Sequence, residues 1–319
     1  MSDLKYVSRF GMVYLADLAL LKLGLRKKQS NLALLQKQKY FEKMSPSEYE
    51  AELKNWFYKE SGRQLNLENP QTFTEKIQWL KLHDSTREKT ILADKYLVRD
   101  WITKKIGEKY LIPLLGVWDK ADDIDYDKLP SQFVLKCNHG CAMNIIVKDK
   151  EKANRKAINK QLDGWLKINY TFVTGDFQLH YKDIQPRIIA EQFMSNVNGE
   201  DLCDYKFFCF NGEPKYCQVI NDRSVGETID FYDMQWNHQN FVGLAPCPNS
   251  PKGCKQPETF EEMKKLAKIL AEGFKFVRVD FYEINGAVYF GEMTFTPGGG
   301  SGRFNPESAD LMLGKMITL

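Results

Sequence analysis

The chain has 319 residues, of which 43% are hydrophobic and 13% are aromatic. This is enough apolar material for a buried core, and it excludes a wholly disordered chain. The 45 Lys and Arg residues nearly balance the 42 Asp and Glu residues, so the formal charge of +3 gives no general attraction to nucleic acid, and any anion site must be local.

The first third of the chain is predicted to be helical, because apolar residues recur there at spacings of three and four. Ser45 and Thr72 are predicted N-caps, with Ser47 and Glu75 nearby. The predicted helices cover residues 10–25, 30–43, 46–60, 72–83 and 88–106.

The segment 10–25 is the most apolar part of the N-terminal region, but charged residues interrupt it and it is shorter than the roughly 18 apolar residues of a membrane span. The basic run 26–28 (Arg-Lys-Lys) follows it. The favoured interpretation is a helix packed on the body of a cytoplasmic protein. The alternative is peripheral contact with anionic lipid at the inner face of the membrane, against which burial of Leu15, Leu18 and Leu21 would argue.

The seven cysteines are an odd number and have no CxxC spacing. Cys137 and Cys141 flank His139, which is a pattern to weigh as a zinc site, but further ligands at matching spacing are missing. We therefore expect reduced thiols.

From about residue 130 the pattern changes to short runs rich in β-branched and aromatic residues, with helical stretches at 152–169 and 258–273. Residues 244–256 are predicted to form a loop. Helices followed by mostly local strand pairs favour an α+β fold. The predicted strands cover residues 133–136, 144–147, 187–193, 205–210, 215–220, 228–232, 276–284 and 288–295.

The strongest candidate for a functional site is the predicted hairpin of residues 276–295. Alternation along its first strand puts Arg278 and Asp280 on one face, and Asn285-Gly286 marks the turn. Glu292 lies on the second strand.

The length of the turn decides whether these polar groups meet. A three-residue loop over 284–286 would bring Arg278, Asp280, Glu292 and Thr294 onto one face, whereas a two-residue turn would separate Asp280 from Glu292. Two carboxylates and a hydroxyl on one face suit a hard cation that shares the phosphates of a nucleotide. The alternative is an exposed acidic face.

Three further motifs carry polar groups in a suggestive order. Lys136 closes an apolar strand and is followed by a loop with Gly140, a combination that can hold phosphate, although a plain hairpin turn is the structural alternative. The run 187–194 could form a strand whose end reads an adenine edge. Lys95 and Arg99 are four residues apart on a predicted helix, where a solvated basic face is the alternative.

Taken in order, these four motifs resemble the ATP-grasp superfamily, and residues 70–300 are similar to the TupA-like ATP-grasp family, which is associated with teichuronopeptide and other cell-surface polysaccharides. The phrases that carry the resemblance are residues 74–81, 133–140, 204–212 and 290–298. It implies an ATP-grasp fold of two α+β lobes gripping ATP: a helical N-terminal region over 1–69, the helical part of the first lobe over 70–130, and nucleotide- and metal-binding lobes over 131–319.

The resemblance also implies a role for each matching residue. Arg278 would steady the transferring phosphoryl group, and Asp204 or Glu200 would meet the ribose. The phosphates would contact Lys95, Lys136, the loop at Gly140 and Lys206. Adenine would lie against Glu191, Gln192, Phe193 and Met194. One or two magnesium ions would be held by Asp280, Glu292 and Thr294.

The sequence departs from the family pattern at two places. Thr294 stands where ATP-grasp metal sites usually have Asn, which weakens the case for a second magnesium ion. Cys141-Ala142-Met143 stands where relatives tend to have Ser-Gly-Gly, which implies a stiffer loop.

The expected function is therefore an ATP- and magnesium-dependent ligase that joins a carboxylate to an amine through an acyl phosphate. The resemblance implies a uronic acid of a surface glycan or its precursor as the carboxylate, and a small amine or amino acid as the partner. The alternatives are a glycosyltransferase using Asp122-Asp123-Ile-Asp125, an ATP-grasp sugar kinase, and a nucleotide binder without turnover.

Overall fold

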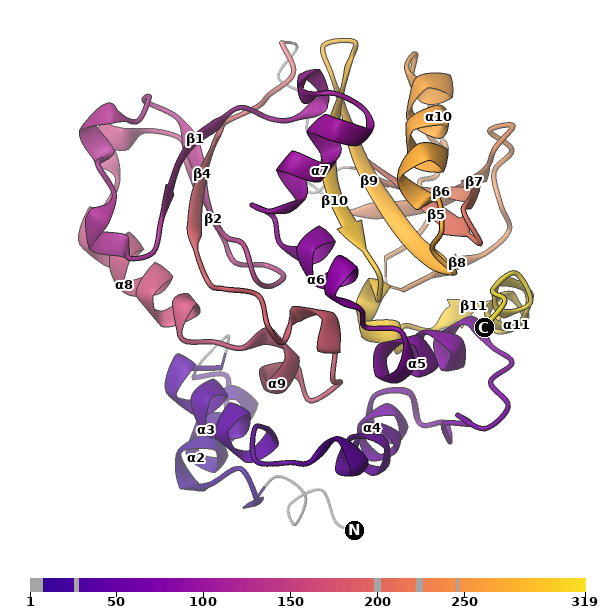
Figure 1. Cartoon of the computed structure of the whole chain (residues 1–319), viewed down its shortest axis with the longest axis horizontal. Coiled ribbons are helices and arrows are strands. Elements are labelled where there is room, and N and C mark those ends of the chain that lie inside the picture. Colours follow the sequence, from indigo (N-terminus) through magenta and orange to yellow (C-terminus); the bar gives the residue numbers. More distant parts are fainter. Residues whose placement is uncertain (1–7, 26–28, 198–201, 222–225, 245–246) are drawn as a thin grey trace. The chain divides into compact units, whose positions relative to one another are not determined.

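The computed structural model describes residues 8–25, 29–197, 202–221, 226–244 and 247–319 (Figure 1). The basic run 26–28 and Glu200 lie outside the described residues. The chain forms two compact units, and the predicted boundaries at 69 and 130 remain predictions. Unit 1 comprises Met1–Trp56 and Leu114–Phe193, and unit 2 comprises Phe57–Pro113 and Met194–Leu319.

The N-terminal part is helical, as predicted. Thr72 caps α5 through a capping box, in which its hydroxyl accepts the N–H of Glu75 and the Glu75 carboxylate accepts the N–H of Thr72. The helices are α2 (Met12–Lys22), α3 (Asn31–Phe41), α4 (Pro46–Ser61), α5 (Phe73–His83), α6 (Arg87–Ala93) and α7 (Val98–Lys105).

The single helix predicted over 88–106 is wrong, because the chain breaks between α6 and α7. Asp94 Oδ1 accepts the N–H groups of Tyr96 at 2.8 Å and Leu97 at 3.1 Å, a local turn that competes with helical bonding. Lys95 therefore lies in a turn and does not share a helix with Arg99.

Helices α2 and α3 pack together, and α3 packs on α9 (Tyr170–Thr174) within unit 1. Lys37 Nζ donates to the carbonyl of Thr174 at 2.9 Å. Leu15, Leu18 and Leu21 are half-buried. No helix in the described part of the chain has the length and apolar character needed to cross a bilayer.

Unit 1 contains an antiparallel four-stranded sheet of order β1–β4–β2–β3. Alternation along β2 buries Phe133 and Leu135 in a core shared with Leu162 of α8 (Arg155–Leu166), which leaves Lys136 on the other face. β1 was missed by sequence reasoning, because all its residues are half-buried and show no alternation. The strands are β1 (Leu114–Trp118), β2 (Phe133–Cys137), β3 (Asn144–Val147) and β4 (Ile188–Gln192).

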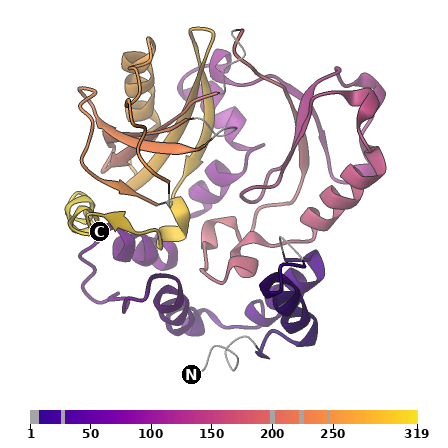
Figure 2. The same ribbon diagram turned by 180° about the vertical axis from the view of Figure 1, so that it is seen from behind.

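Unit 2 is built on an antiparallel five-stranded sheet of order β10–β9–β5–β6–β7, which Figure 2 shows from behind. A two-stranded pair joins β8 (Val242–Gly243) and β11 (Phe304–Asn305). The strands of the larger sheet are β5 (Asp204–Phe210), β6 (Glu213–Asn221), β7 (Thr228–Asp233), β9 (Phe276–Ile284) and β10 (Ala287–Thr294).

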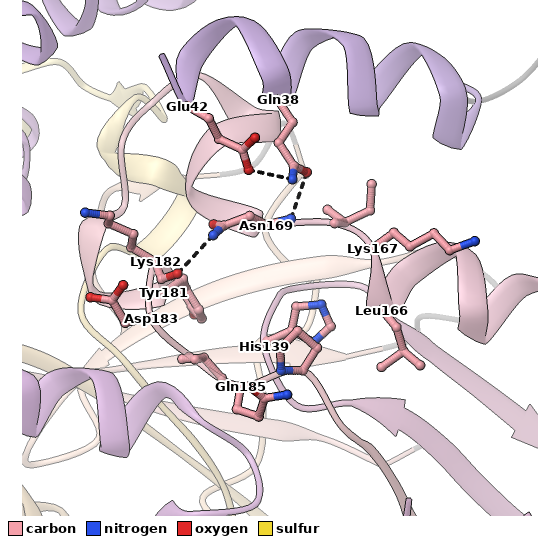
Figure 3. Close-up of a pocket in the computed structure, with 13 residues that line it drawn as sticks. Gln38, Glu42, His139, Leu166, Lys167, Asn169, Tyr181, Lys182, Asp183 and Gln185 are labelled. Carbon is pink, nitrogen blue, oxygen red and sulfur yellow. Dashed lines mark hydrogen bonds between the residues drawn. The ribbon is translucent and has the colours of Figure 1, made fainter. Parts of the chain in front are cut away.

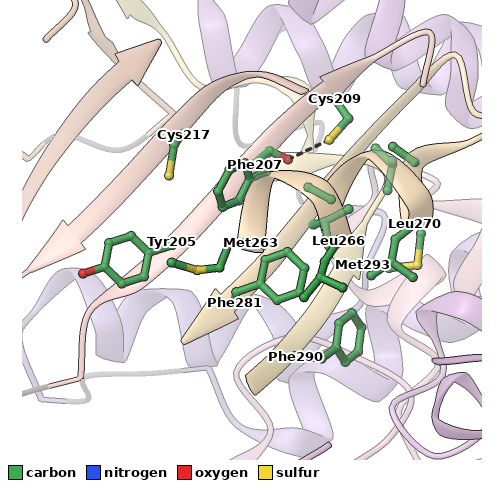
Figure 4. Packing of buried hydrophobic residues seen from close by; sticks show 14 of the residues in the cluster. Tyr205, Phe207, Cys209, Cys217, Met263, Leu266, Leu270, Phe281, Phe290 and Met293 are labelled. Carbon is green, nitrogen blue, oxygen red and sulfur yellow. Dashed lines mark hydrogen bonds between the residues drawn. The ribbon is translucent and has the colours of Figure 1, made fainter. Parts of the chain in front are cut away.

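The two faces of this sheet differ. Helix α10 (Phe260–Ala271) covers one face, where Phe207 and Phe281 pack with Met263 in the largest apolar core (Figure 4). On the opposite face, Phe208 packs with residues of α5 and α11 (Ser308–Gly314). Lys206 and Asp280 also lie on that second face, where they bond each other. The α+β fold predicted from the sequence is confirmed.

Candidate active site

The hairpin of β9 and β10 has a two-residue turn. Ala287 lies opposite Ile284, and the two residues between them, Asn285 and Gly286, have φ values of 53° and 76°. These left-handed conformations are those of a type I′ turn, which matches the twist of the flanking strands. The prediction that a three-residue loop brings Asp280 and Glu292 together is therefore wrong.

A β-bulge at Gly291 nevertheless brings the carboxylates together. Phe290 lies opposite Phe281, but Glu292 lies opposite Asp280, so the pairing shifts by one residue. Phe290 consequently faces the core under α10, while Glu292 faces the polar side with Asp280. A Cβ at Gly291 would lie only 3.1 Å from the carbonyl oxygen of Asp280, which favours glycine there.

Arg278 links the polar groups of the two strands. Its Nε and Nη2 donate to the Asp280 carboxylate, each at 2.7 Å, which is a bidentate pair. The same Nη2 lies 2.8 Å from Glu292 Oε1. Thr294 Oγ1 accepts from Arg278 Nη2 at 3.0 Å and donates to Glu292 Oε1 at 2.9 Å. The predicted convergence of these four side chains is thus present.

Lys206 extends the cluster onto β5. It lies opposite Asp280 in the pairing of β5 with β9, and its ammonium bonds the Asp280 carboxylate as well as Asp204 Oδ1 at 3.3 Å. Both carboxylates are 2% exposed, so the ion pairs are shielded from water. We call Asp204, Lys206, Arg278, Asp280, Glu292 and Thr294 the carboxylate cluster.

Burial opposes ionisation of the Glu292 carboxyl, but the positive charges of Arg278, Lys95 and Lys206 outweigh it and lower its pKa to about 2. Burial likewise opposes the charge on Arg278, and the carboxylates of Asp280 and Glu292 outweigh it and raise the pKa of Arg278. Lys95 therefore lies close enough to act on this cluster electrostatically.

The donor set fits a magnesium ion that is shared with phosphates. Carboxylate and hydroxyl oxygens are hard ligands, and Mg²⁺ in nucleotide sites is commonly held by one or two carboxylates plus phosphate oxygens. Among the described residues, the side-chain hydrogen bonds of Glu292 all involve Oε1, which leaves Oε2 for a metal. Within the described ranges, no group of three or more His, Cys, Asp or Glu residues could hold a metal ion by itself.

In unit 1, Lys136 and Glu191 form an ion pair across neighbouring strands. Lys136 Nζ lies 2.5 Å from Glu191 Oε2, and the Glu191 side chain is 10% exposed against 26% for Lys136. They share a face because Val134, two residues before Lys136, lies opposite Glu191. Lys136 is predicted to contact phosphate, and Glu191 is predicted to contact adenine. Each side chain must therefore release the other when the nucleotide binds.

The loop after β2 is held at its base. Asn138 Oδ1 accepts the N–H of Arg187 at 2.6 Å, and Asn138 Nδ2 donates to the carbonyl of Gln185 at 3.0 Å. A Cβ at Gly140 would come within 3.0 Å of Tyr170, so glycine fits this close approach. The exposed part of the loop is Cys141 and Ala142. β2 and β3 pair as a hairpin, which confirms the structural alternative for this segment, and the phosphate contact of the loop stays a prediction.

A pocket of about 350 Å³ lies behind this loop in unit 1 and was missed by sequence reasoning. Figure 3 shows His139 beside Gln185, and the Gln38 amide between Glu42 and Asn169. Gln38 accepts the N–H of Asn169 at 2.8 Å and donates to Glu42 at 2.8 Å. This wall of the pocket joins Gln38 of α3 to Asn169, which lies 131 residues later in the chain. A local sequence motif cannot indicate such a distant contact.

The other predicted residues are placed as follows. Gln192 is exposed, whereas Phe193 and Met194 are half-buried at the point where the chain passes from unit 1 to unit 2. Cys137 is buried in β2 and Cys141 is exposed, and neither forms a disulfide with another described residue. The three carboxylates at 122, 123 and 125 are exposed. Asp125 caps a short 3₁₀ helix and pairs with Lys128 at 2.9 Å.

Comparison with solved structures finds several ATP-grasp enzymes. D-alanine–D-alanine ligase from Bacillus anthracis, complexed with ATP, is 16% identical with a TM-score of 0.40, over 69% of this chain and 58% of that chain. The ATP-grasp ligase PsnB, complexed with its minimal precursor, Mg and ADP, is 10% identical with a TM-score of 0.36, over 66% of this chain and 52% of that one.

N5-carboxyaminoimidazole ribonucleotide synthetase from Thermus thermophilus is 11% identical with a TM-score of 0.35, over 64% of this chain and 45% of that one. The chain thus spans about half the length of these proteins. The comparison with curated proteins gives no match. The model of the TupA-like ATPgrasp family matches residues 75–318, and the chain belongs to that family.

Proposed function

We propose that the chain is a ligase that uses ATP and magnesium to join a carboxylate to an amine, with ADP and phosphate as products. The observation that carries this proposal is the carboxylate cluster, where Arg278 bonds Asp280, Glu292 and Thr294 on one face of the sheet. Membership of the TupA-like ATPgrasp family supports it.

The reaction has two steps. An oxygen of the substrate carboxylate attacks the γ-phosphorus of ATP, and ADP leaves with the electrons of the broken P–O bond. The amine nitrogen then attacks the acyl carbon, phosphate leaves, and the nitrogen loses a proton. Neither step needs a nucleophilic side chain, which agrees with a site made of lysines, an arginine and carboxylates.

The residues of the chain would act by binding and charge neutralisation. Arg278 holds its guanidinium against Asp280 and Glu292, the proposed metal ligands, where its positive charge would neutralise the transferring phosphoryl group. Lys95, Lys136 and Lys206 would contact phosphate oxygens, and the loop at Gly140 would keep water from the acyl phosphate. Bound magnesium would neutralise phosphate charge.

The remaining contacts concern the nucleoside. Glu191, Gln192, Phe193 and Met194 would bind adenine, and Asp204 would bind the ribose, although Asp204 is buried and bonded to Lys206. Thr294 would supply a neutral third oxygen to the metal.

We further propose a uronic acid of a cell-surface polysaccharide, or its precursor, as the carboxylate, and a small amine or amino acid as the acceptor. Such an enzyme would work in capsule or related polysaccharide biosynthesis in the cytoplasm, with the N-terminal region touching the inner face of the membrane. The exposed side chains of Met12, Leu23 and Leu25 support that contact, and the half-buried Leu15, Leu18 and Leu21 weigh against it.

An ADP-release assay with panels of uronic acids and amines tests the proposal. ADP release that requires both an acid and an amine is expected. Release with a sugar alone would mean a kinase, UDP release from a UDP-sugar would mean a glycosyltransferase, and tight ATP binding without turnover would mean a binder. Glu292→Ala should lower kcat at least about a hundredfold, comparable with the loss of one preorganised electrostatic group.

A further inference from the structure

A second pocket in unit 2 carries two arginines outside the carboxylate cluster. It has a volume of about 400 Å³, within the range of roughly 300 to 1,000 Å³ typical of small-molecule sites, and is lined by residues 61–63, 303–305 and Glu307. We call it the arginine pocket. It is formed where the end of α4 meets β11.

Both guanidinium groups are held in place by the fold. Arg303 Nη2 donates to the carbonyl of Ser61 at 2.6 Å. Arg63 Nη1 donates to Asp310 at 2.8 Å and Arg63 Nη2 donates to Thr74 at 3.2 Å. Asp310 is itself fixed, since it accepts the backbone N–H of Thr74 at 2.8 Å. Fixed donors lose little conformational freedom when a ligand binds.

The two arginines differ in whether a carboxylate compensates their positive charge. Asp310, which is 1% exposed, neutralises Arg63. Arg303 forms no ion pair among the residues that the structure describes, and the only hydrogen bond of its guanidinium there is to a neutral carbonyl. The guanidinium of Arg303 therefore offers a positive charge with no carboxylate bonded to it, together with further N–H donors, while the carboxylates of Asp310 and Glu307 both lie against Arg63. A singly charged carboxylate matches this better than a doubly charged phosphate.

The other lining groups suit a hydroxylated ligand. The side-chain amide of Asn305 is exposed and has no hydrogen-bond partner within the described ranges, so it can donate to and accept from hydroxyl groups. Phe304 offers the edge of a mostly buried aromatic ring. The one opposing feature is Glu307, whose carboxylate is 79% exposed and lies 3.8 Å from Arg63 Nη1.

The arginine pocket is connected to the carboxylate cluster along the chain. β10 ends at Thr294, and the next short helix, Pro297–Gly300, is anchored to α5 because Lys81 Nζ donates to the carbonyl of Gly299 at 2.6 Å. Arg303 is the third residue after this helix. The same unit therefore holds the proposed metal ligands and a separate fixed guanidinium.

We propose that the arginine pocket is a binding subsite for a sugar acid, with Arg303 on its carboxylate and Asn305 on its hydroxyl groups. This deepens the proposed function and depends on it only for the role of the bound sugar acid in catalysis. Binding by itself requires neither ATP nor magnesium.

Titration calorimetry of the full chain without ATP or magnesium tests the subsite, with D-glucuronate, D-glucose and inorganic phosphate as probes. Glucuronate should bind at least about tenfold more tightly than glucose, because charge-assisted hydrogen bonds are roughly twice as strong as neutral ones. Phosphate should bind more weakly than glucuronate. Equal binding of glucose and glucuronate, tighter binding of phosphate, or no binding of glucuronate would overturn the assignment.

Variants locate the site. Arg303→Gln should weaken glucuronate binding about tenfold and Arg303→Lys less, since lysine keeps the charge but not the planar fork. Glu307→Gln should tighten it about two- to fivefold, the range of an exposed charge interaction. Lys265→Gln, at an exposed lysine of α10, is the matched control and should change nothing. Unchanged affinity in both Arg303→Gln and Glu307→Gln would reject the site.

These readouts separate the subsite from the ligase activity. A wild-type chain that binds glucuronate but releases no ADP keeps the subsite and rejects the ligase. Acid- and amine-dependent ADP release with an unchanged KM for the acid in Arg303→Gln keeps the ligase and rejects the subsite. Thermal unfolding of each variant ensures that lost binding is not lost folding, and Glu307→Gln reports on the site even if Arg303→Gln fails to fold.

Discussion

Glu292 lies directly opposite Asp280 although a two-residue turn joins their strands. Without the bulge at Gly291, the period of two along a strand would turn Glu292 toward the core under α10, where Phe290 points. A single extra residue in β10 thus reverses the alternation: Phe290 before the bulge and Met293 after it both face the core, while Glu292 faces the cluster. The geometry of the proposed metal site depends on this irregularity.

Gly291→Ala should therefore destabilise the protein and impair the cluster together. The new Cβ would lie 3.1 Å from a backbone oxygen, and overpacking of this kind costs about 1 to 3 kcal/mol of unfolding free energy. Urea denaturation measures the loss, and magnesium-dependent ATP binding should weaken in parallel. Gly226→Ala is the control, since nothing lies within 4 Å of a Cβ there. Equal effects of the two substitutions would contradict the role of the bulge.

Glu292→Gln should flatten the acid dependence of stability. The pKa of Glu292 is lowered to about 2 in the folded protein, against about 4.3 in an unfolded chain. Its ionisation therefore stabilises the fold above about pH 4.3, and this contribution is lost as the pH falls toward about 2. The free-energy difference between wild type and Glu292→Gln, measured by urea denaturation, should shrink between about pH 6 and about pH 3.

The control is Glu272→Gln, because the Glu272 side chain is 77% exposed. A difference between wild type and Glu292→Gln that stays constant across this pH range would show that the carboxylate is not held ionised by its cationic neighbours. Near neutral pH, the pH profile of activity should show no step that comes from ionisation of Glu292, whichever result is obtained.

The sequence predicted most strands of the two larger sheets, because β-branched and aromatic residues are concentrated in them. The bounds 144–147 and 276–284 agree with β3 and β9. The bulge was not predicted, although a glycine inside a strand pattern is a signal for one. The break before Lys95 was missed because Asp94 fits a helical pattern until its side chain bonds the following N–H groups.

The candidate site, too, could be predicted from the sequence only in part. Arg278, Asp280, Glu292 and Thr294 could be grouped from the sequence, because they share one hairpin. The partners of Lys136 and of Lys206 could not, since each cation reaches a carboxylate on a strand 55 or 74 residues away. Contacts over such separations follow from strand order, which local patterns do not specify.

Thr294→Val should weaken the metal requirement selectively. The hydroxyl of Thr294 donates to Glu292 and accepts from Arg278, so its loss removes both a proposed oxygen ligand and the bond that orients Glu292. Loss of a ligand-orienting partner costs about 10- to 100-fold in metal affinity or activity. The magnesium concentration for half-maximal ADP release should rise accordingly, and Thr294→Asn should lower it. Identical magnesium curves for wild type and Thr294→Val would exclude Thr294 from the metal site.

Lys136 and Glu191 offer a test that separates stability from catalysis. Because Glu191 is mostly buried, Lys136→Met removes the cation facing it and should cost about 1 to 3 kcal/mol of unfolding free energy. Adding Glu191→Gln should recover most of that loss, since the buried charge that has lost its lysine is then gone. If Lys136 binds phosphate, kcat should fall at least about a hundredfold in both the single and the double variant.

The control is Lys128→Met, at a pair whose lysine side chain is 85% exposed, and it should change neither the unfolding free energy nor kcat. Recovery of turnover along with stability in the double variant would make the pair purely structural.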